Sequence, residues 1–119
     1  MSASIQLEQQ SYPPGAVLRG RIALRPPPGD ESKKVELSVL WETEGKGDTD
    51  IGVIFYRVLC DGDPVAGAEE HAFEVDLPAL PLSYQGHLLK IGWRVRVRRL
   101  RGLGDDTVVD APFQLEWPA

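Results

Sequence analysis

The sequence predicts an all-β protein, folded as an antiparallel β-sandwich of about seven to nine strands. Two observations support this fold class. Short segments of alternating apolar and polar residues recur along the chain, separated by turns at intervals of roughly 8–12 residues. No segment carries a sustained helical period of apolar residues. Because strand side chains alternate between two faces, each sheet is expected to have one face in the core and one in water.

The expected strands are the segments 4–7, 17–24, 35–42, 51–60, 69–77, 90–100 and 108–117. A turn at 12–15 separates the first two, because Pro presets φ and Gly permits conformations that other residues avoid. The three prolines at 26–28 favour a stiff loop over a recognition peptide, since they form one short run between two strands. Polar turns at 45–50, 61–64 and 102–106 separate later strands.

Alternation also predicts which residues face the core. These are Val35, Leu37, Val39 and Trp41 in the third segment, His71, Phe73, Val75 and Leu77 in the fifth, and Ile91, Trp93, Val95 and Val97 in the sixth. Segment 51–60 is the exception, because it is apolar on both faces. If Ile54 and Tyr56 lie inside, Val53 and Phe55 have no core to face. Either this strand is bulged or covered by a loop, or its outward residues form a contact patch for a partner or a homodimer. An unprotected edge strand would add a route to pairing by β-augmentation.

Length and composition set the class of protein. The 119 residues suit a single domain spanning 1–119, without linkers or repeats. Apolar and charged residues make up 42% and 26% of the chain, as is common for soluble globular proteins. A net charge of −5 disfavours binding to nucleic acid or to an anionic membrane. We see no signal peptide and no apolar run that could span a membrane. The single cysteine, Cys60, excludes an internal disulfide, so a cytoplasmic location is expected.

No group of residues has the pattern of a catalytic or metal site. Cys60, His71 and His87 lie far apart in the sequence and in different elements, which disfavours a Cys-His nucleophile pair. Cys60 is expected to be a small apolar residue at a strand end, and His71 a partly buried strand histidine. Paired aspartates occur in three turns, where they commonly bond their own backbone, and they lack the spacing of a calcium-binding loop. The sequence therefore predicts a non-enzymatic protein with no metal and no cofactor.

A stripe of arginines is the sharper candidate site. Arg94, Arg96 and Arg98 alternate with the core residues of the sixth segment, so they line one solvent face, and Arg99 and Arg101 continue the stripe. Two interpretations stay open. The arginines pair with acidic residues of neighbouring strands, for which the candidates are Glu36, Glu42, Glu74 and Asp76. Alternatively, they recognise an anion such as an acidic peptide, a phosphate group or a lipid headgroup.

Three motifs resemble those of arrestin-type domains and together cover nearly the whole chain. Residues 12–20, Tyr-Pro-Pro-Gly-Ala-Val-Leu-Arg-Gly, are similar to the opening motif of these domains. Residues 77–86 and 91–95 are similar to their central proline-rich block and the strand after it, and 111–115 to the strand that closes their first half. The residues that carry the match are Tyr12, Pro14, Gly15, Gly20, Pro78, Pro81, Ser83, Tyr84, Gly86, Trp93, Pro112 and Phe113.

The resemblance implies an immunoglobulin-like sandwich of the arrestin type and a non-enzymatic adaptor or scaffold role. In such a fold, Pro78 and Pro81 end a strand and force a crossing to the other sheet. Gly15 and Gly86 suit turns that other residues would strain, and Tyr84 packs its ring under the crossing.

Three departures limit what the resemblance implies. Full arrestins have two sandwiches, whereas this chain has one. Glu8-Gln9-Gln10 stands where some arrestins carry a basic pair for phosphate sensing, and no Pro-Pro-x-Tyr peptide is present. These departures favour a bacterial stand-alone form, near the sporulation-control type, over an animal receptor-binding arrestin.

We therefore expect a cytoplasmic protein-interaction or scaffold module whose partner is another protein. Its contact surface is expected at the arginine stripe and at Val53 and Phe55. The alternative is a binding domain for a small anionic ligand or lipid headgroup, centred on Arg94, Arg96 and Arg98.

Overall fold

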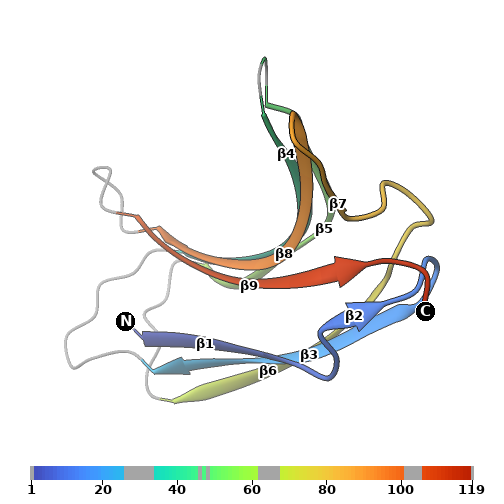
Figure 1. Ribbon diagram of the computed structural model, residues 1–119. Helices are drawn as coiled ribbons and strands as arrows, with labels where there is room; N and C mark the ends of the chain where they lie inside the picture. The colour runs from blue at the N-terminus through green and yellow to red at the C-terminus, as the bar shows by residue number, and fades with distance from the viewer. Residues whose placement is uncertain are drawn as a thin grey trace.

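The computed structural model describes residues 2–25, 34–45, 47, 49–61, 68–100 and 106–118. Within these ranges the chain forms strands and turns and no helix, so no described helix could cross a membrane. Two sheets pack face to face (Figure 1), which confirms the predicted all-β sandwich. Arg101, the triple proline at 26–28 and most of the turns predicted at 61–64 and 102–106 lie outside the described residues.

The described strands are β1 (Ser2–Leu7), β2 (Ser11–Tyr12), β3 (Val17–Arg25), β4 (Lys34–Gly45), β5 (Ile51–Asp61), β6 (Glu69–Asp76), β7 (Tyr84–Gln85), β8 (Leu89–Leu100) and β9 (Thr107–Leu115). A small sheet has the order β1-β3-β6, and a large sheet has the order β2-β9-β8-β4-β5, with β7 paired to β8. All pairs are antiparallel except β2 with β9. All seven predicted segments are strands. The sequence does not predict β2 and β7, because two residues are too few for alternation to show.

The core lies between the sheets and is built from the inward-facing side chains of both. Trp93 is its largest fully buried side chain, with 1% of its surface exposed. Its ring lies 5.8 Å from that of Phe113, and Tyr12 meets Phe113 edge to face, also at 5.8 Å. Burying one such large apolar side chain contributes roughly 2–3 kcal/mol to folding. The motif residues Tyr12, Trp93 and Phe113 therefore stabilise the fold.

Two of the sequence motifs meet where β6 ends. The amide of Gly15 donates to the carbonyl of Pro78 (3.3 Å), and the amide of Leu77 donates to the carbonyl of Ala16 (2.9 Å). Gly15 has a φ of +79°, a conformation that residues with a Cβ rarely adopt. The turn that includes Pro14 thus holds the start of the crossing segment. The sequence predicts the turn but not this contact.

The crossing then connects the small sheet to the large one. The indole Nε1 of Trp93 donates to the carbonyl of Pro81 (2.7 Å). The amide of Ser83 donates to the carbonyl of Leu115 (2.8 Å), and its hydroxyl accepts from the amide of Leu115 (2.9 Å). These bonds fix the crossing segment to β8 and β9, so the chain crosses between the sheets in the segment where the sequence predicts it.

Gly20 is required for space. A Cβ at Gly20 would lie 2.8 Å from the ring of Phe73 and 2.6 Å from the carbonyl oxygen of Gln6. The Phe73 ring occupies this space and is itself buried. Any side chain at Gly20 would therefore displace a core ring.

The predicted packing of Tyr84 is wrong. Its side chain is 56% exposed rather than packed under the crossing. Its ring lies over Gly86, where a Cβ would come within 2.6 Å of it. Gly86 has no positive φ, so this glycine makes room for the ring and does not relieve a strained turn. Tyr84 begins the two-residue strand β7, which is too short for alternation to reveal its faces, and this is why the sequence misplaces the ring.

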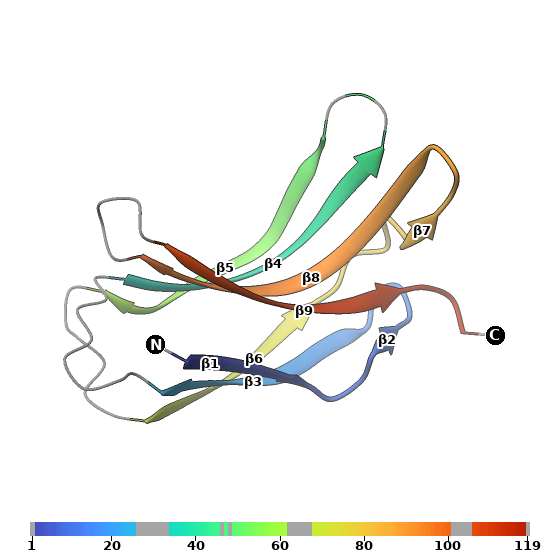
Figure 2. The same cartoon turned by 60° about the vertical axis from the view of Figure 1, so that its left-hand side comes forward.

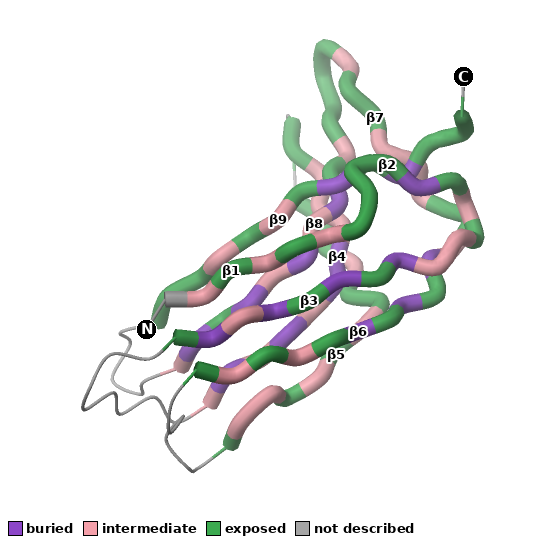
Figure 3. The backbone as a smooth tube through the Cα atoms, turned by 90° about the horizontal axis from the view of Figure 1, so that it is seen from below, coloured by how far each residue is buried: buried purple, intermediate pink, exposed green. Residues whose placement is uncertain are grey.

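The large sheet bends away from the small sheet toward the β4–β5 hairpin (Figures 1 and 2). Its outer face, which points away from the small sheet, is therefore concave. Burial is uneven across the sheet: β4 and β8 carry buried residues, whereas none of the residues of β5 is fully buried (Figure 3). This difference separates two parts of the concave face.

Candidate interaction surface

The concave outer face of the large sheet holds most of the candidate contact residues. Strand register arranges them in rows that cross β8, β4 and β5. These rows are Arg98–Glu36–Val58, Arg96–Ser38–Tyr56 and Arg94–Leu40–Val53. We call the side of this face around β8 and β9 the charged half; it consists of Arg94, Arg96, Arg98, Glu42, Asp106 and Asp110. We call the other side the apolar half: Ile51, Val53, Tyr56 and Val58 of β5, with the adjoining Ile54.

Arg94 is the most enclosed cation of the charged half. Its Nη2 lies 2.6 Å from Oε2 of Glu42, and its Nη1 lies 3.6 Å from Oδ2 of Asp110. The side chains of Arg94 and Glu42 are both mostly buried. Pairing is favourable here because each charge has lost much of its water.

Arg96 and Arg98 are also paired. Arg96 donates two hydrogen bonds to Asp110, from Nε to Oδ1 (2.8 Å) and from Nη2 to Oδ2 (3.2 Å). These bonds to Asp110 raise the pKa of the Arg96 guanidinium. Arg98 donates to Asp106 at 2.9 Å. Each of the three arginines thus contacts a carboxylate, as the pairing interpretation expects.

Only one of the predicted acidic partners is correct. Glu42 pairs with Arg94, but Glu74 lies in the small sheet and pairs with Arg19 at 3.1 Å. Asp76 is in the small sheet as well, and Glu36 accepts from a tyrosine instead. The sequence analysis missed Asp106 and Asp110, although β8 and β9 form a hairpin that puts Asp110 directly opposite Arg96. Counting equal numbers of residues on both sides of the turn predicted at 102–106 would have placed these aspartates beside the arginines of β8.

Arg99 does not continue the stripe. It lies on the core side of β8, is 7% exposed and donates from Nε to the hydroxyl of Thr107 (3.1 Å). Adjacent strand residues point to opposite faces, so Arg99 and Arg98 cannot share a surface. The prediction that Arg99 belongs to the contact face is therefore wrong.

The apolar half differs in its exposure. Val53 is 56% and Tyr56 52% exposed, and Ile51, Ile54 and Val58 are also exposed. Val53 was a candidate contact residue, and the structure places it on the surface. Leu40 of β4, in the same row as Val53, is only 3% exposed. The apolar surface thus begins at β5 and becomes buried toward β4.

The predicted faces of β5 are reversed between two bulges, from Phe55 to Val58, whereas Ile51 and Val53 face outward as expected. A bulged strand is one of the interpretations that the sequence leaves open. Ile54 and Leu59 have no partner on β4, so two β-bulges shift the alternation. Phe55 consequently lies opposite core residue Val39 and packs against the core, and it is not the exposed contact residue that we expected. Tyr56, expected inside, faces out. A bulge changes the face of every residue beyond it, and alternation alone does not reveal where it falls.

Tyr56 is tied to the neighbouring strand by its hydroxyl, which donates to Oε2 of Glu36. This bond to a carboxylate raises the pKa of Tyr56 above its ordinary value, with desolvation as a smaller cause. The ring itself remains exposed. The surface therefore presents an oriented aromatic ring beside aliphatic side chains, a combination common in protein contacts.

β5 is also an edge of the large sheet, and β6 is an edge of the small sheet. Arg57 of β5 reaches across to donate from Nη2 to the carbonyl of Ala72 in β6 (3.0 Å). This bond covers an edge carbonyl of β6. It does not cover the edge of β5.

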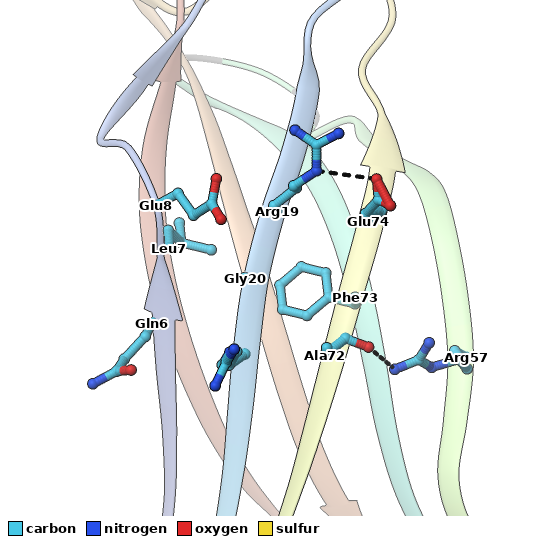
Figure 4. Close-up of a pocket in the computed structure, with 10 residues that line it drawn as sticks. Gln6, Leu7, Glu8, Arg19, Gly20, Arg57, Ala72, Phe73 and Glu74 are labelled. Atoms are coloured by element: carbon cyan, nitrogen blue, oxygen red, sulfur yellow. Dashed lines mark hydrogen bonds and ion pairs between the residues drawn. The ribbon is translucent and has the colours of Figure 1, made fainter.

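A trough of about 620 Å³ runs along the small sheet (Figure 4). Arginines and glutamates from different strands line it, and Arg19 and Glu74 pair across β3 and β6. A second, smaller hollow of about 380 Å³ lies on the concave face and is lined by Tyr84, Gly92 and Arg94 among others.

The histidines and the cysteine lie apart from both halves of the concave face. Cys60 is half-buried near the end of β5 and packs against the core, close to what we expected. His71 is partly buried, as predicted, with Nε2 3.1 Å from Oε2 of Glu69. His87 is exposed. Among the described residues, no three side chains of His, Cys, Asp or Glu are grouped as a metal site requires.

The chain was compared with known proteins. No protein-family model and no curated protein matches it. Among solved structures, it is similar to the crystal structure of Spo0M, a sporulation control protein from Bacillus subtilis, with a TM-score of 0.63 and 14% sequence identity. The similarity covers 98% of this chain and 49% of Spo0M, so the chain spans about half the length of that structure. At this identity the similarity concerns the fold, and the nine described strands form an arrestin-like β-sandwich.

Proposed function

We propose that this chain is a non-enzymatic protein-interaction module that contacts another protein through the apolar half of its concave face. One observation carries the proposal: the exposed apolar side chains of β5 are adjacent to one another on one strand. Scattered exposed apolar residues are normal, whereas a contiguous group of them is typical of a contact surface. The single-domain organisation and cytoplasmic location expected from the sequence are part of this proposal.

The alternative, binding of an anionic ligand to the arginines, has less support. Arg94, Arg96 and Arg98 already contact carboxylates. An incoming anion would have to displace those carboxylates and leave them partly buried without a partner, which is unfavourable. The apolar half needs no such displacement, because water is all that a partner would remove from it.

Site-specific photo-crosslinking in the cells that produce the protein tests the proposal. A photoreactive phenylalanine analogue replaces Val53 in one variant and Val108 in the control, since Val108 is similarly exposed on β9. We expect one dominant protein adduct from position 53 and much less from position 108. Equal labelling at both positions, or no adduct at 53, would contradict the proposal. The adduct is identified by mass spectrometry, and its yield should fall when Val58 is changed to Asp.

A further inference from the structure

The sequence of β5 is that of a central strand, yet the strand lies at an edge. From Ile51 to Cys60 its only charged residue is Arg57, and apolar residues occur on both faces. Strands covered on both faces have this composition, whereas edge strands usually carry Lys, Pro, inward charges or bulges that prevent pairing. β5 carries no Lys and no Pro, so its protection is limited to two bulges and one inward charge, Arg57, which lies opposite Leu37 and donates to the carbonyl of Ala72.

Other edges of the described sheets are protected. The carbonyl of Ala72 on β6 accepts from Arg57. On the opposite side of the large sheet, the short strand β2 pairs with the end of β9, the rest of β9 includes Pro112 and Asp110, and β1 lies against it. Proline cannot donate to an added strand, and a charge at an edge opposes pairing. The contrast makes β5 the edge best suited to accept a strand.

The bulges of β5 limit where a strand can be added. Ile54 and Leu59 have no partner on β4, whereas the residues from Phe55 to Val58 pair without interruption. Bulges disturb the regular spacing of edge hydrogen bonds. An added strand would therefore be short and centred on this regular stretch, with Tyr56 and Val58 beside its outward-facing side chains.

Charge indicates which occupant fits. The exposed residues Asp50 and Asp61 stand at the two ends of β5, and the chain has a net charge of −5. A second copy paired antiparallel through β5 would bring its own Asp50 and Asp61 close to those of the first, and like charges would repel. A segment that is apolar in its middle and basic at both ends would instead meet Asp50 at one end and, at the other, Asp61, which lies opposite Lys34 of β4.

We propose that the outer edge of β5, which pairs with no other described strand, binds an extended, apolar segment of a partner protein that carries Lys or Arg at both ends, by strand addition. This inference deepens the proposed function and rests on it. Main-chain hydrogen bonds would supply affinity, the apolar half would contact alternate side chains, and Asp50 and Asp61 would select for the basic ends.

Fluorescence anisotropy with three labelled decapeptides tests the proposal. The probe has alternating Val and Thr in its middle and two Lys at each end. The second peptide replaces each Lys with Glu. The third keeps Lys but carries N-methyl groups on alternate backbone amides, and it is made in two versions, one for each edge of the peptide. Methylation removes the backbone donors that strand pairing needs. We expect saturable binding of the probe and binding weaker by about tenfold or more for the other two.

A charge-swapped protein sharpens the test. In Asp50→Lys/Asp61→Lys we expect the preference to invert, so that the Glu-ended peptide binds better than the probe. The control Glu8→Lys/Asp76→Lys makes the same change in net charge on the small sheet and should keep the original preference. Hydrogen exchange should show new protection of β5 amides when the probe binds.

Several results would overturn this inference. They are equal binding of all three peptides, no binding of the probe, an unchanged preference in the charge-swapped protein, or a concentration-dependent dimer that the probe dissociates. The proposed function fails separately. If a partner is crosslinked at position 53 but none of the peptides binds, the proposed interaction module is supported and the proposed strand addition is contradicted.

Discussion

The two halves of the concave face use similar positions on the same sheet in opposite ways. In the charged half, Arg94, Arg96 and Arg98 contact carboxylates of the same molecule, so their interactions are largely complete in the free protein. In the apolar half, Val53 and Tyr56 are more than half exposed, so much of their side-chain surface faces water in the free protein. The most conspicuous charges in this sequence are therefore engaged within the fold, whereas the proposed partner contact lies on an apolar strand.

The boundary between the halves should show the largest difference in stability. Leu40 and Val53 lie opposite each other, but Leu40 is buried and Val53 is exposed. We expect Leu40→Ala to lower the free energy of unfolding by about 2–4 kcal/mol, because it leaves a cavity. Val53→Ala should cost about 0.5 kcal/mol or less, since exposed positions contribute little. Urea denaturation of both variants measures the difference, and equal losses would contradict the assignment of the boundary.

A double-mutant cycle on Arg94 and Glu42 in the charged half should give the next largest effect on the free energy of unfolding. Arg94→Met leaves Glu42 mostly buried without its cation, so we expect a loss of about 1–2 kcal/mol. Glu42→Gln in the Arg94→Met background should restore part of that loss, with a coupling energy of about 1 kcal/mol between the two residues. Chemical denaturation of the wild type, both single variants and the double variant measures it. Strict additivity would mean that this ion pair is as weak as an exposed one.

The apolar half should respond in binding more than in stability. Val53→Thr/Val58→Thr keeps the β-branched shape on an exposed strand, so the free energy of unfolding should change by less than about 1 kcal/mol. Binding of the Lys-ended decapeptide should nevertheless weaken by about fivefold or more, because apolar contact area is lost. Val108→Thr on β9 is the matched control and should leave binding unchanged. A stability loss as large as that of Leu40→Ala would show that β5 is structural instead.

The smallest effect concerns the pH dependence of the Tyr56–Glu36 bond. The folded pKa of Tyr56 is raised, so the neutral phenol is stabilised by folding. That contribution is complete below the unfolded pKa of about 10 and is lost as pH rises through the folded value. Absorbance at the tyrosinate band, compared with that of Tyr56→Phe, should show Tyr56 ionising at higher pH than a free tyrosine. Glu36→Gln should move that ionisation to lower pH, and an unchanged titration would contradict the assignment.

The core and the crossing could be predicted because each depends on local pattern. Trp93 and Val95 follow a period of two in a strand without bulges, and Pro78 and Pro81 act through their missing donors wherever they occur. Tyr84 and Arg99 could not be placed equally well. The position of Tyr84 depends on a two-residue strand, and the surroundings of Arg99 depend on residues that other strands bring to it.

Hydrophobic periodicity and turn chemistry act over a few residues, so the sequence alone predicts the fold class, the strand segments and the buried face of most strands. Which carboxylates meet the arginines, which face of β5 is exposed and that β5 lies at an edge are known only from the three-dimensional structure. Register, bulges and strand order arise from contacts between segments far apart in the chain. A contact site built from those features becomes visible only when the strands are assembled.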